Sequence, residues 1–211
     1  MDGNNRWSKK NNLDTNYSYR EGAKNLIKIA NHCFLKHDVN YVSAFALSSH
    51  NLYRSKKLLS SIFKILNSYL DDFLLNSKNY KFNIRFIGSF DIFEKKIKDK
   101  LNKVNYNNIH SKTLIIALNY SGTHDITNAS LLFNKNKNKK LKFNDFLYTS
   151  NYPNPDLLIR TGGHQRLSDF FLFQINFTEL FFLKILWPDF KIKSLDTIIN
   201  KFIKIERKFG K

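Results

Sequence analysis

The sequence predicts an α/β fold, with one domain over residues 1–211 and a mainly parallel central sheet flanked by helices. Short runs rich in β-branched and aromatic residues alternate along the chain with segments of 3.6-residue apolar periodicity. Two of the short runs are almost entirely apolar, which is typical of strands covered on both faces. A length of 211 residues also suits a single domain with a sizeable core.

The expected elements follow one another in strand–helix order, which favours parallel strands with ligands beyond their carboxyl ends. The strand-like runs are residues 41–47, 82–87, 113–118 and 156–159. Helical periodicity covers residues 21–36, 57–75, 92–101, 125–133 and 194–208. The lysine- and asparagine-rich residues 134–142 are expected to form a solvated loop.

Composition excludes several classes of protein. A single cysteine, Cys33, rules out a disulfide framework and a cysteine-based zinc cluster. The N-terminus has no apolar region of the kind found in secretion signals, and polar residues interrupt the most apolar stretch, residues 170–187. We therefore expect a cytoplasmic, soluble protein, whose charge would favour contact with an anionic membrane surface.

The net charge of +18 raises the question of nucleic-acid binding. The chain has 28 lysines and 7 arginines, and the lysines are spread along it rather than gathered in one region. A basic nucleic-acid module predicts clustered charge with stacking aromatics, so we expect no nucleic-acid partner. The arginines are more informative, because a rigid, bidentate guanidinium suits diphosphates and carboxylates. Five of them fall near predicted element ends: Arg6, Arg54, Arg160, Arg166 and Arg207.

The N-terminal sequence combines a carboxylate, a flexible glycine and backbone N–H groups ahead of an expected helix. A helix N-terminus attracts anions, and an acidic residue beside it can hold Mg²⁺ against a phosphate. Asp-Gly is also an ordinary turn signal, so this motif alone is weak. The residues concerned are Asp2, Gly3, Asn4, Asn5, Arg6 and Trp7.

Residues 160–168, RTGGHQRLS, follow a predicted strand and form a more specific motif. Arg160, Arg166 and the hydroxyls of Thr161 and Ser168 could surround a phosphate on several sides. The spacing is neither that of a P-loop nor that of a dinucleotide-binding loop. His164 lacks a partner at metal-ligand spacing, which argues against a metal there.

A third polar segment, residues 48–54, also follows a strand. Ser48 and His50 allow a nucleophile pair in principle, but the GxSxG sequence of a nucleophile elbow is missing. The interpretation that we favour is a polar loop that lines a ligand site, with Arg54 on an anionic group.

Taken together, these residues resemble the cis-prenyltransferases, in particular the bacterial undecaprenyl diphosphate synthases. The similar segments occur in family order and span nearly the whole chain. They are MDGNNRW (1–7), FALSSHNLYR (45–54), LNYSGTHDI (118–126), residues 156–174, TELFF (178–182), LWPDF (186–190) and ERKFG (206–210).

The resemblance implies a homodimeric, Mg²⁺-dependent enzyme that condenses isopentenyl diphosphate onto an allylic diphosphate, usually farnesyl diphosphate. The product would be a long-chain polyprenyl diphosphate such as undecaprenyl diphosphate, a lipid carrier precursor for cell-wall synthesis. Among the site residues, it implies Asp2 and Asn51 as catalytic and Asp2 and Glu179 as metal ligands. It implies substrate binding by Gly3, Asn4, Asn5, Arg6, Trp7, Ser48, Arg54, Arg160, Arg166 and Ser168, and a C-terminal element, with Arg207 and Gly210, that closes over the neighbouring site.

Departures from the family pattern open an alternative, a degenerate, non-catalytic subunit that binds prenyl diphosphates. Retention of the Asp2-Gly3-Asn4 motif argues against it. The family's first strand is missing or shortened here, and the general base and the product length stay open. The substituted positions are Thr15, Tyr19, His50, Leu52, Leu58, Thr123 and His164.

Overall fold

The computed structural model describes residues 1–53, 55–106, 109–138 and 140–208. The chain divides into two compact units, each built from segments that are distant in sequence. The first unit contains Met1–His37, Asn154–Arg166 and the C-terminal segment from Gln174. The second unit contains Asp38–Pro153 and Leu167–Phe173.

A three-stranded parallel sheet forms the core of the second unit, in the order β1-β3-β2. It consists of β1 (Tyr41–Ser48), β3 (Thr113–Tyr120) and β2 (Asn83–Ile87). All eight residues of β3 are buried, because both neighbouring strands pair with it and its side chains are almost all apolar. This strand is the centre of the unit's core.

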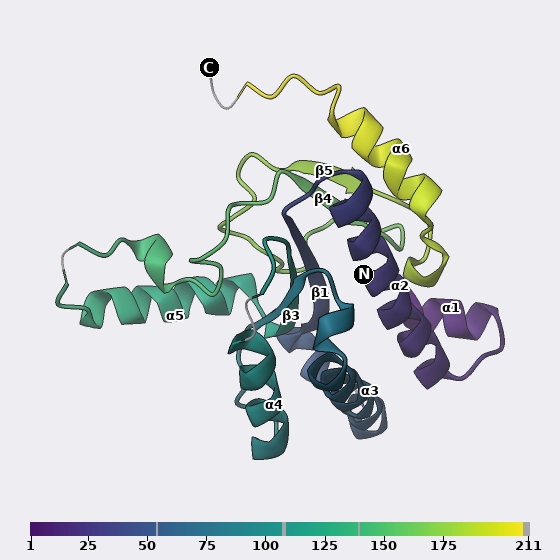
Figure 1. Ribbon diagram of the computed structural model, residues 1–211, viewed down its shortest axis with the longest axis horizontal. Helices are drawn as coiled ribbons and strands as arrows, with labels where there is room; N and C mark the ends of the chain where they lie inside the picture. The colour runs from purple at the N-terminus through teal and green to yellow at the C-terminus, as the bar shows by residue number, and fades with distance from the viewer. Residues whose placement is uncertain (54, 107–108, 139, 209–211) are drawn as a thin grey trace. The chain divides into compact units, whose positions relative to one another are not determined.

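Three long helices accompany this sheet within the second unit. Helix α3 packs against α4, and α4 packs against β2 (Figure 1). The helix that follows β3 begins at a serine cap, where Ser121 accepts a hydrogen bond from the N–H of His124. The elements are α3 (Lys56–Leu75), α4 (Lys95–Tyr106) and α5 (Gly122–Lys135), with short 3-10 turns η1 (Ser49–Tyr53), η2 (Ser77–Asn79) and η3 (Phe143–Phe146).

The first unit combines a two-stranded parallel sheet with three helices. Strand β4 (Leu157–Arg160) pairs with β5 (Glu179–Phe182), with Leu157 opposite Glu179 and Arg160 opposite Phe182. Helix α1 packs against α2, and α2 also contacts α6 (Figure 1). These elements are α1 (Asn4–Lys10), α2 (Thr15–Lys36), α6 (Ile192–Phe202) and the turn η4 (Trp187–Asp189).

The structure confirms the predicted α/β class and its parallel strands. All four predicted strands are present, within two residues of the expected ends, whereas β5 was not predicted. The helix predicted over 194–208 is wrong in its second half, because α6 ends at Phe202. The helix predicted from residue 21 begins earlier, at Thr15, because the Asp14 side chain accepts a hydrogen bond from Asn16 N and caps it. A single domain over the whole chain stays a prediction.

In the part of the chain that the structure describes, no helix combines the length and apolar character needed to span a membrane.

Candidate diphosphate-binding site

Asp2 is held at the end of strand β4 by the residue that follows this strand. The Thr161 hydroxyl accepts a hydrogen bond from Asp2 N and donates one to Asp2 O, both at 3.0 Å. The N–H of Trp187 donates a further bond to Asp2 O. Thr161 is 1% exposed, so its hydroxyl is committed to the Asp2 backbone. The expectation that this hydroxyl faces a phosphate is therefore wrong.

Two arginines converge on the Asp2 carboxylate. Arg160 Nη2 lies 3.0 Å from Oδ2, and Arg6 Nη2 lies 3.3 Å from Oδ1. Partial burial disfavours the charged carboxylate, but the hydrogen bond from Arg160 and the charge of Arg6 outweigh this effect, so the pKa of Asp2 lies below its ordinary value. The structure thus brings three of the predicted site residues together around one ionised carboxylate.

Two glycines follow Thr161, and the first of them leaves space for the Arg6 side chain beside Asp2. Gly162 has φ +91°, and a Cβ atom added there would lie 2.6 Å from Arg6 Nη2 and 3.1 Å from Asp2 Cβ. Gly163 has φ +81°, but an added Cβ would meet nothing closer than 3.9 Å. Both residues use a backbone conformation that favours glycine, and Gly162 also allows Arg6 to reach Asp2.

Gly3 caps the N-terminus of α1, and its φ of +112° sets the turn into the helix. Trp7 Nε1 donates to Asp189 Oδ1 at 2.9 Å, and its ring stacks on Tyr17. Asn4 turns its side-chain oxygen toward α2, where a Cβ on Gly22 would lie 2.3 Å from it. Asn5 is mainly exposed on the same helix. Of the predicted residues 2–7, Arg6 thus contacts the Asp2 carboxylate, whereas Asn4 and Trp7 hold α1 against its neighbours.

Glu179 lies apart from Asp2 in the same unit. It begins β5 opposite Leu157, whereas Arg160 lies three residues further along the ladder, about 10 Å away at the usual strand rise. Glu179 lines an open cavity of about 320 Å³ together with Glu206, Arg207 and Lys208. The structure therefore joins Glu179 with the C-terminal Arg207, and Gly210 lies outside the described residues. Arg207 also pairs with Asp156 and donates to Phe177 O at 2.9 Å.

The remaining predicted residues lie at the second unit's strand ends and in the loop after β4. Ser48 is buried at the end of β1, where its hydroxyl accepts a hydrogen bond from His50 N at 3.2 Å. Asn51 lies in the following turn, η1, and Arg54 lies outside the described residues. Arg166 is exposed, and its carbonyl accepts a hydrogen bond from Arg160. Ser168 is exposed in a left-handed conformation with φ +53°.

Asp169 is a site-adjacent residue that sequence reasoning missed. Its Oδ1 accepts hydrogen bonds from Thr123 N at 2.9 Å and Thr123 Oγ1 at 2.8 Å, and its Oδ2 accepts one from Ser121 Oγ. Burial acts against ionisation, but the Ser121 bond, the two Thr123 bonds and the His50 ring, whose Nε2 lies 3.4 Å from Oδ2, lower the pKa of Asp169. This carboxylate connects the loop that contains Ser168 to the start of α5. In the sequence, the only signal for this role is the Ser-Asp pair of that loop.

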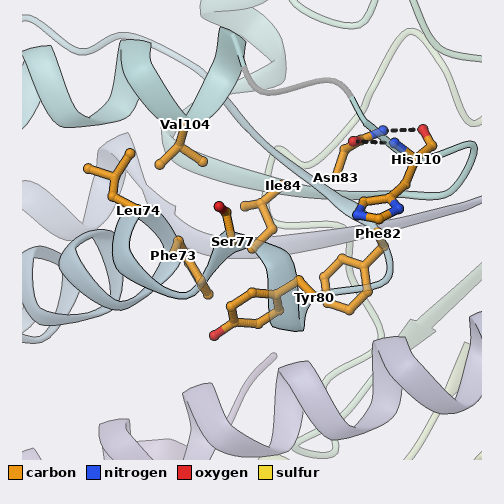
Figure 2. A pocket seen from close by; sticks show the side chains of 9 residues that line it. All are labelled: Phe73, Leu74, Ser77, Tyr80, Phe82, Asn83, Ile84, Val104 and His110. Atoms are coloured by element: carbon orange, nitrogen blue, oxygen red, sulfur yellow. Dashed lines mark hydrogen bonds between the residues drawn. The ribbon is translucent and has the colours of Figure 1, made fainter.

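A small cavity with a mixed polar and apolar lining lies beside the sheet of the second unit (Figure 2). Its volume is about 50 Å³, and Phe73, Tyr80 and Ile84 line it, while Asn83 closes one side through its bond from His110 N. Apolar cavities of roughly 150 Å³ are needed to take up a benzene-sized molecule. The cavity is therefore too small for a prenyl chain, and Phe73, which lines it, is buried as part of the core.

Comparison with known proteins places this architecture in a family. Residues 1–210 match the family described as "Putative undecaprenyl diphosphate synthase", and the chain belongs to this family of cis-prenyltransferases. It is 36% identical to an isoprenyl transferase from Helicobacter pylori, over 100% of this chain and 94% of the relative. It is 34% identical to a ditrans,polycis-undecaprenyl-diphosphate synthase of Acinetobacter baylyi, over 100% and 89% of the two chains.

A solved structure agrees with this assignment. The crystal structure of lavandulyl diphosphate synthase from Lavandula x intermedia, in complex with dimethylallyl diphosphate, matches with a TM-score of 0.89 at 25% identity. The match covers 100% of this chain and 95% of that chain. The chain is accordingly a prenyltransferase of isoprenoid biosynthesis, and the resemblance of its motifs to this family is confirmed.

Proposed function

We propose that this enzyme condenses isopentenyl diphosphate with an allylic diphosphate, farnesyl diphosphate in the first instance, and repeats the reaction to make a long-chain polyprenyl diphosphate such as undecaprenyl diphosphate. In each cycle the allylic C–O bond to diphosphate breaks, a C–C bond to isopentenyl diphosphate forms, and one proton leaves the new chain. The observation that carries this proposal is the Asp2 carboxylate between Arg6 and Arg160.

Arg6 suits a diphosphate better than it suits a permanent ion pair with Asp2. Arg6 is 46% exposed at its side chain, and its 3.3 Å contact with Asp2 is long for a charge-assisted hydrogen bond. An arriving diphosphate offers more negative charge than one carboxylate, so Arg6 can turn to it at little cost. In this proposal Arg6, with Gly3, Asn4, Asn5 and Trp7 of the same segment, receives the allylic diphosphate.

The residues around Asp2 also fit Mg²⁺. This ion is held in proteins by one or two carboxylates together with substrate phosphates, and Asp2 presents an ionised, partly exposed carboxylate beside diphosphate-binding arginines. Asp2 would hold the ion, with Glu179 of a neighbouring chain as a second oxygen ligand. Bound there, Mg²⁺ would neutralise charge on the diphosphate as it leaves.

Isopentenyl diphosphate is assigned to the segment after β4. Arg160, Arg166 and Ser168 supply two guanidinium groups and a hydroxyl within nine residues. The backbone at Ser168 is left-handed, as in a turn. Arg160 is 13% exposed at its side chain and keeps its orientation through Asp2 and the Arg166 carbonyl. Ser48, Asn51 and Arg54 are assigned to the reacting end, with Asn51 the catalytic residue among them.

A homodimer is part of the proposal. Glu179 and Arg207 line one open cavity, and Glu179 lies at the other end of the β4–β5 ladder from Arg160, which binds Asp2. In this arrangement Glu179 and Arg207 serve the site of a neighbouring chain. We further propose a cytoplasmic enzyme that touches the inner face of the membrane, where a net charge of +18 attracts anionic lipid and an apolar product must be delivered. Nucleic acid is not a partner in this proposal.

The alternative of a non-catalytic subunit is not favoured. The charged cluster of Asp2, Arg6 and Arg160 is present with its geometry, and the named relatives are transferases and synthases.

The test is a condensation assay with the purified full-length chain, farnesyl diphosphate, labelled isopentenyl diphosphate and Mg²⁺. We expect label in the butanol-extractable fraction, and chromatography of the dephosphorylated product gives its length. Parallel reactions started with dimethylallyl or geranyl diphosphate define the allylic substrate. A folded, dimeric sample that produces no extractable label with any starter contradicts the proposal.

A further inference from the structure

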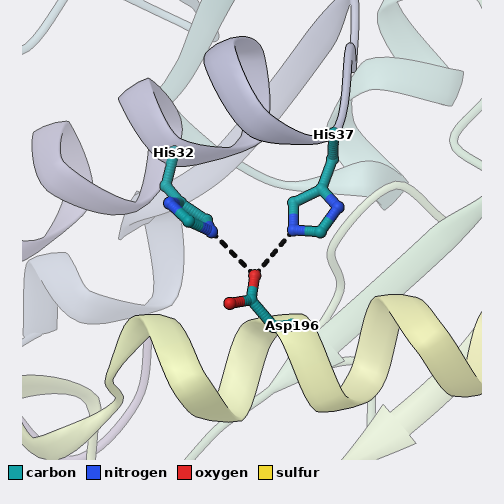
Figure 3. Close-up of side chains that lie close together, drawn as sticks. All are labelled: His32, His37 and Asp196. Atoms are coloured by element: carbon teal, nitrogen blue, oxygen red, sulfur yellow. Dashed lines mark hydrogen bonds and ion pairs between the residues drawn. The ribbon is translucent and has the colours of Figure 1, made fainter.

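Two histidines of the first unit face the same carboxylate oxygen (Figure 3). His32 Nε2 lies 2.7 Å and His37 Nε2 lies 2.6 Å from Asp196 Oδ1. The imidazole rings are 5.3 Å apart between centroids and inclined at 70°, so they approach the oxygen from two different directions. Among the described residues, this is the group of three whose nitrogen and oxygen atoms all lie within 4.8 Å of one another.

The local sequence explains the convergence. His32 lies in the last turns of α2, and His37 is the residue that ends this helix, so the non-helical backbone at His37 turns its ring back toward His32. Asp196 comes from α6, which packs against α2. The cluster therefore joins two helices that are far apart in sequence.

The donor set is that of a divalent transition metal. Two imidazole nitrogens and one carboxylate oxygen suit Zn²⁺, and the preference for nitrogen distinguishes them from the all-oxygen ligands that Mg²⁺ takes. The buried Cys33 is adjacent to His32 in sequence, but its sulfur is not among the ligand atoms that lie within 4.8 Å of one another, so it is not part of this set. The side chains of His32, His37 and Asp196 are 20%, 13% and 35% exposed, which leaves an entry path from solvent.

We propose that His32, His37 and Asp196 bind one divalent transition-metal ion, for which Zn²⁺ is the probe, and that the ion cross-links the end of α2 to α6. In the metal-free protein the three side chains hold each other by hydrogen bonds. On binding, each ring gives up its Nε2 proton to solvent and carries one proton on Nδ1 as a neutral imidazole, and metal bonds of about 2.0–2.2 Å replace the two Nε2–H···Oδ1 contacts. A water molecule completes the coordination, because three protein ligands leave one position open. This site is separate from the Mg²⁺ site proposed at Asp2.

Three features separate the proposal from a purely structural hydrogen-bond cluster. A metal site requires both imidazole nitrogens and the carboxylate, saturates at one ion per chain, and stabilises the fold only while the ion is present. A hydrogen-bond cluster stabilises the fold equally after treatment with a chelator. The measurement must therefore compare metal-loaded and chelator-treated protein.

The experiment uses the full-length chain without a polyhistidine tag, dialysed first against a chelator and then against Zn²⁺ or Co²⁺ in excess Mg²⁺. We expect one Zn²⁺ bound per chain, visible absorption bands of four-coordinate Co²⁺, and a melting temperature several degrees higher with Zn²⁺. His32→Gln, His37→Gln and Asp196→Asn should each lower the affinity at least tenfold. His124→Gln, an exposed histidine of α5, should bind as the wild type does.

Two further readouts keep the outcome decisive. Far-UV circular dichroism of each variant shows whether it folds, and Asp2→Ala should retain Zn²⁺ binding, because the proposed Mg²⁺ site does not contribute to it. Wild-type protein that binds no more Zn²⁺ than the folded His37→Gln variant contradicts the proposal. So does a Zn²⁺-induced shift in melting temperature that persists in Asp196→Asn.

Discussion

Asp2 in the first unit and Asp169 in the second are both aspartates whose pKa lies below the ordinary value, but their partners differ in kind. Asp2 faces two charged guanidinium groups at 3.0 and 3.3 Å. The carboxylate of Asp169 accepts hydrogen bonds mainly from uncharged groups, the N–H and hydroxyl of Thr123 and the hydroxyl of Ser121, with His50 Nε2 further away at 3.4 Å.

This difference separates a carboxylate that can change partners from one that cannot. Arg6, whose side chain is partly exposed, can leave Asp2 for a diphosphate and let the carboxylate bind a cation, while Arg160 keeps its place. Ser121 and Thr123, which donate to Asp169, belong to the start of α5, so losing these bonds means opening that helix end, and His50 of η1 adds a longer contact at 3.4 Å. We therefore expect substitutions at Asp2 to change the chemistry and substitutions at Asp169 to change the stability.

The largest effect is expected for Asp2→Ala, which should lower turnover about 100-fold or more. The variant lacks the carboxylate that would hold Mg²⁺ against the leaving diphosphate. The midpoint of urea unfolding should change little, since Thr161 holds the backbone of Asp2 rather than its carboxylate. Steady-state rates with labelled isopentenyl diphosphate measure the first effect.

A matched control for Asp2→Ala is Glu21→Ala in the same unit. Glu21 also pairs with a basic side chain, Lys24 at 2.7 Å, but on the surface of α2. Its turnover should equal that of the wild type. Full activity in Asp2→Ala would remove the metal-binding role from this residue.

Asp169→Ala should lower the free energy of unfolding by about 1–3 kcal/mol, because Thr123 N and the Ser121 hydroxyl lose a partly buried acceptor. Asp169→Asn keeps one acceptor oxygen and should cost less than the alanine variant. Urea unfolding monitored by circular dichroism measures both. If the two variants are as stable as the wild type and only their turnover falls, Asp169 acts in the chemistry and the distinction drawn above is wrong.

A smaller effect is expected at the glycine pair beside Asp2. Gly162→Ala should reduce kcat/KM about tenfold, a change of about 1.4 kcal/mol, since its Cβ displaces Arg6 from the carboxylate. Gly163→Ala is the control, because it has the same left-handed strain but meets no atom closer than 3.9 Å. Both variants should lose about 1 kcal/mol of stability. Equal kcat/KM in the two variants contradicts the role assigned to Arg6.

The fold class could be predicted because each buried strand is a run of consecutive apolar residues, which is visible in the sequence. The run of apolar residues in β3 is a local pattern, and it correctly indicates a strand covered on both sides. Strand β5 was missed because its four residues lie within a longer apolar stretch without strand boundaries of its own. The end of α6 at Phe202 was also missed, since the apolar periodicity continues beyond the helix.

The candidate site could be predicted in its residue types but only partly in its contacts. Arginines rare enough to stand out among lysines identified Arg6 and Arg160, which the structure brings to one carboxylate. The role of Thr161 as a clamp on the Asp2 backbone joins residues 159 positions apart, and no local pattern encodes it. His32, His37 and Asp196 meet for the same reason, through the packing of two helices.

The smallest expected effects are those of pH and salt on the stability that Asp2 and Asp169 each contribute. For both, the folded-state pKa is lowered, so the stabilisation is complete above the unfolded-state pKa of about 4 and is lost as the pH falls through the folded-state pKa. The stability difference between wild type and Asp2→Asn or Asp169→Asn should therefore shrink below about pH 4. At pH 8, 1 M NaCl should shrink it further for Asp2, whose partner Arg6 is exposed to screening, than for Asp169, whose hydrogen bonds come from the uncharged Ser121 and Thr123. Equal salt sensitivity of the two differences in unfolding free energy would mean that the arginines contribute no more to Asp2 than the hydroxyls contribute to Asp169.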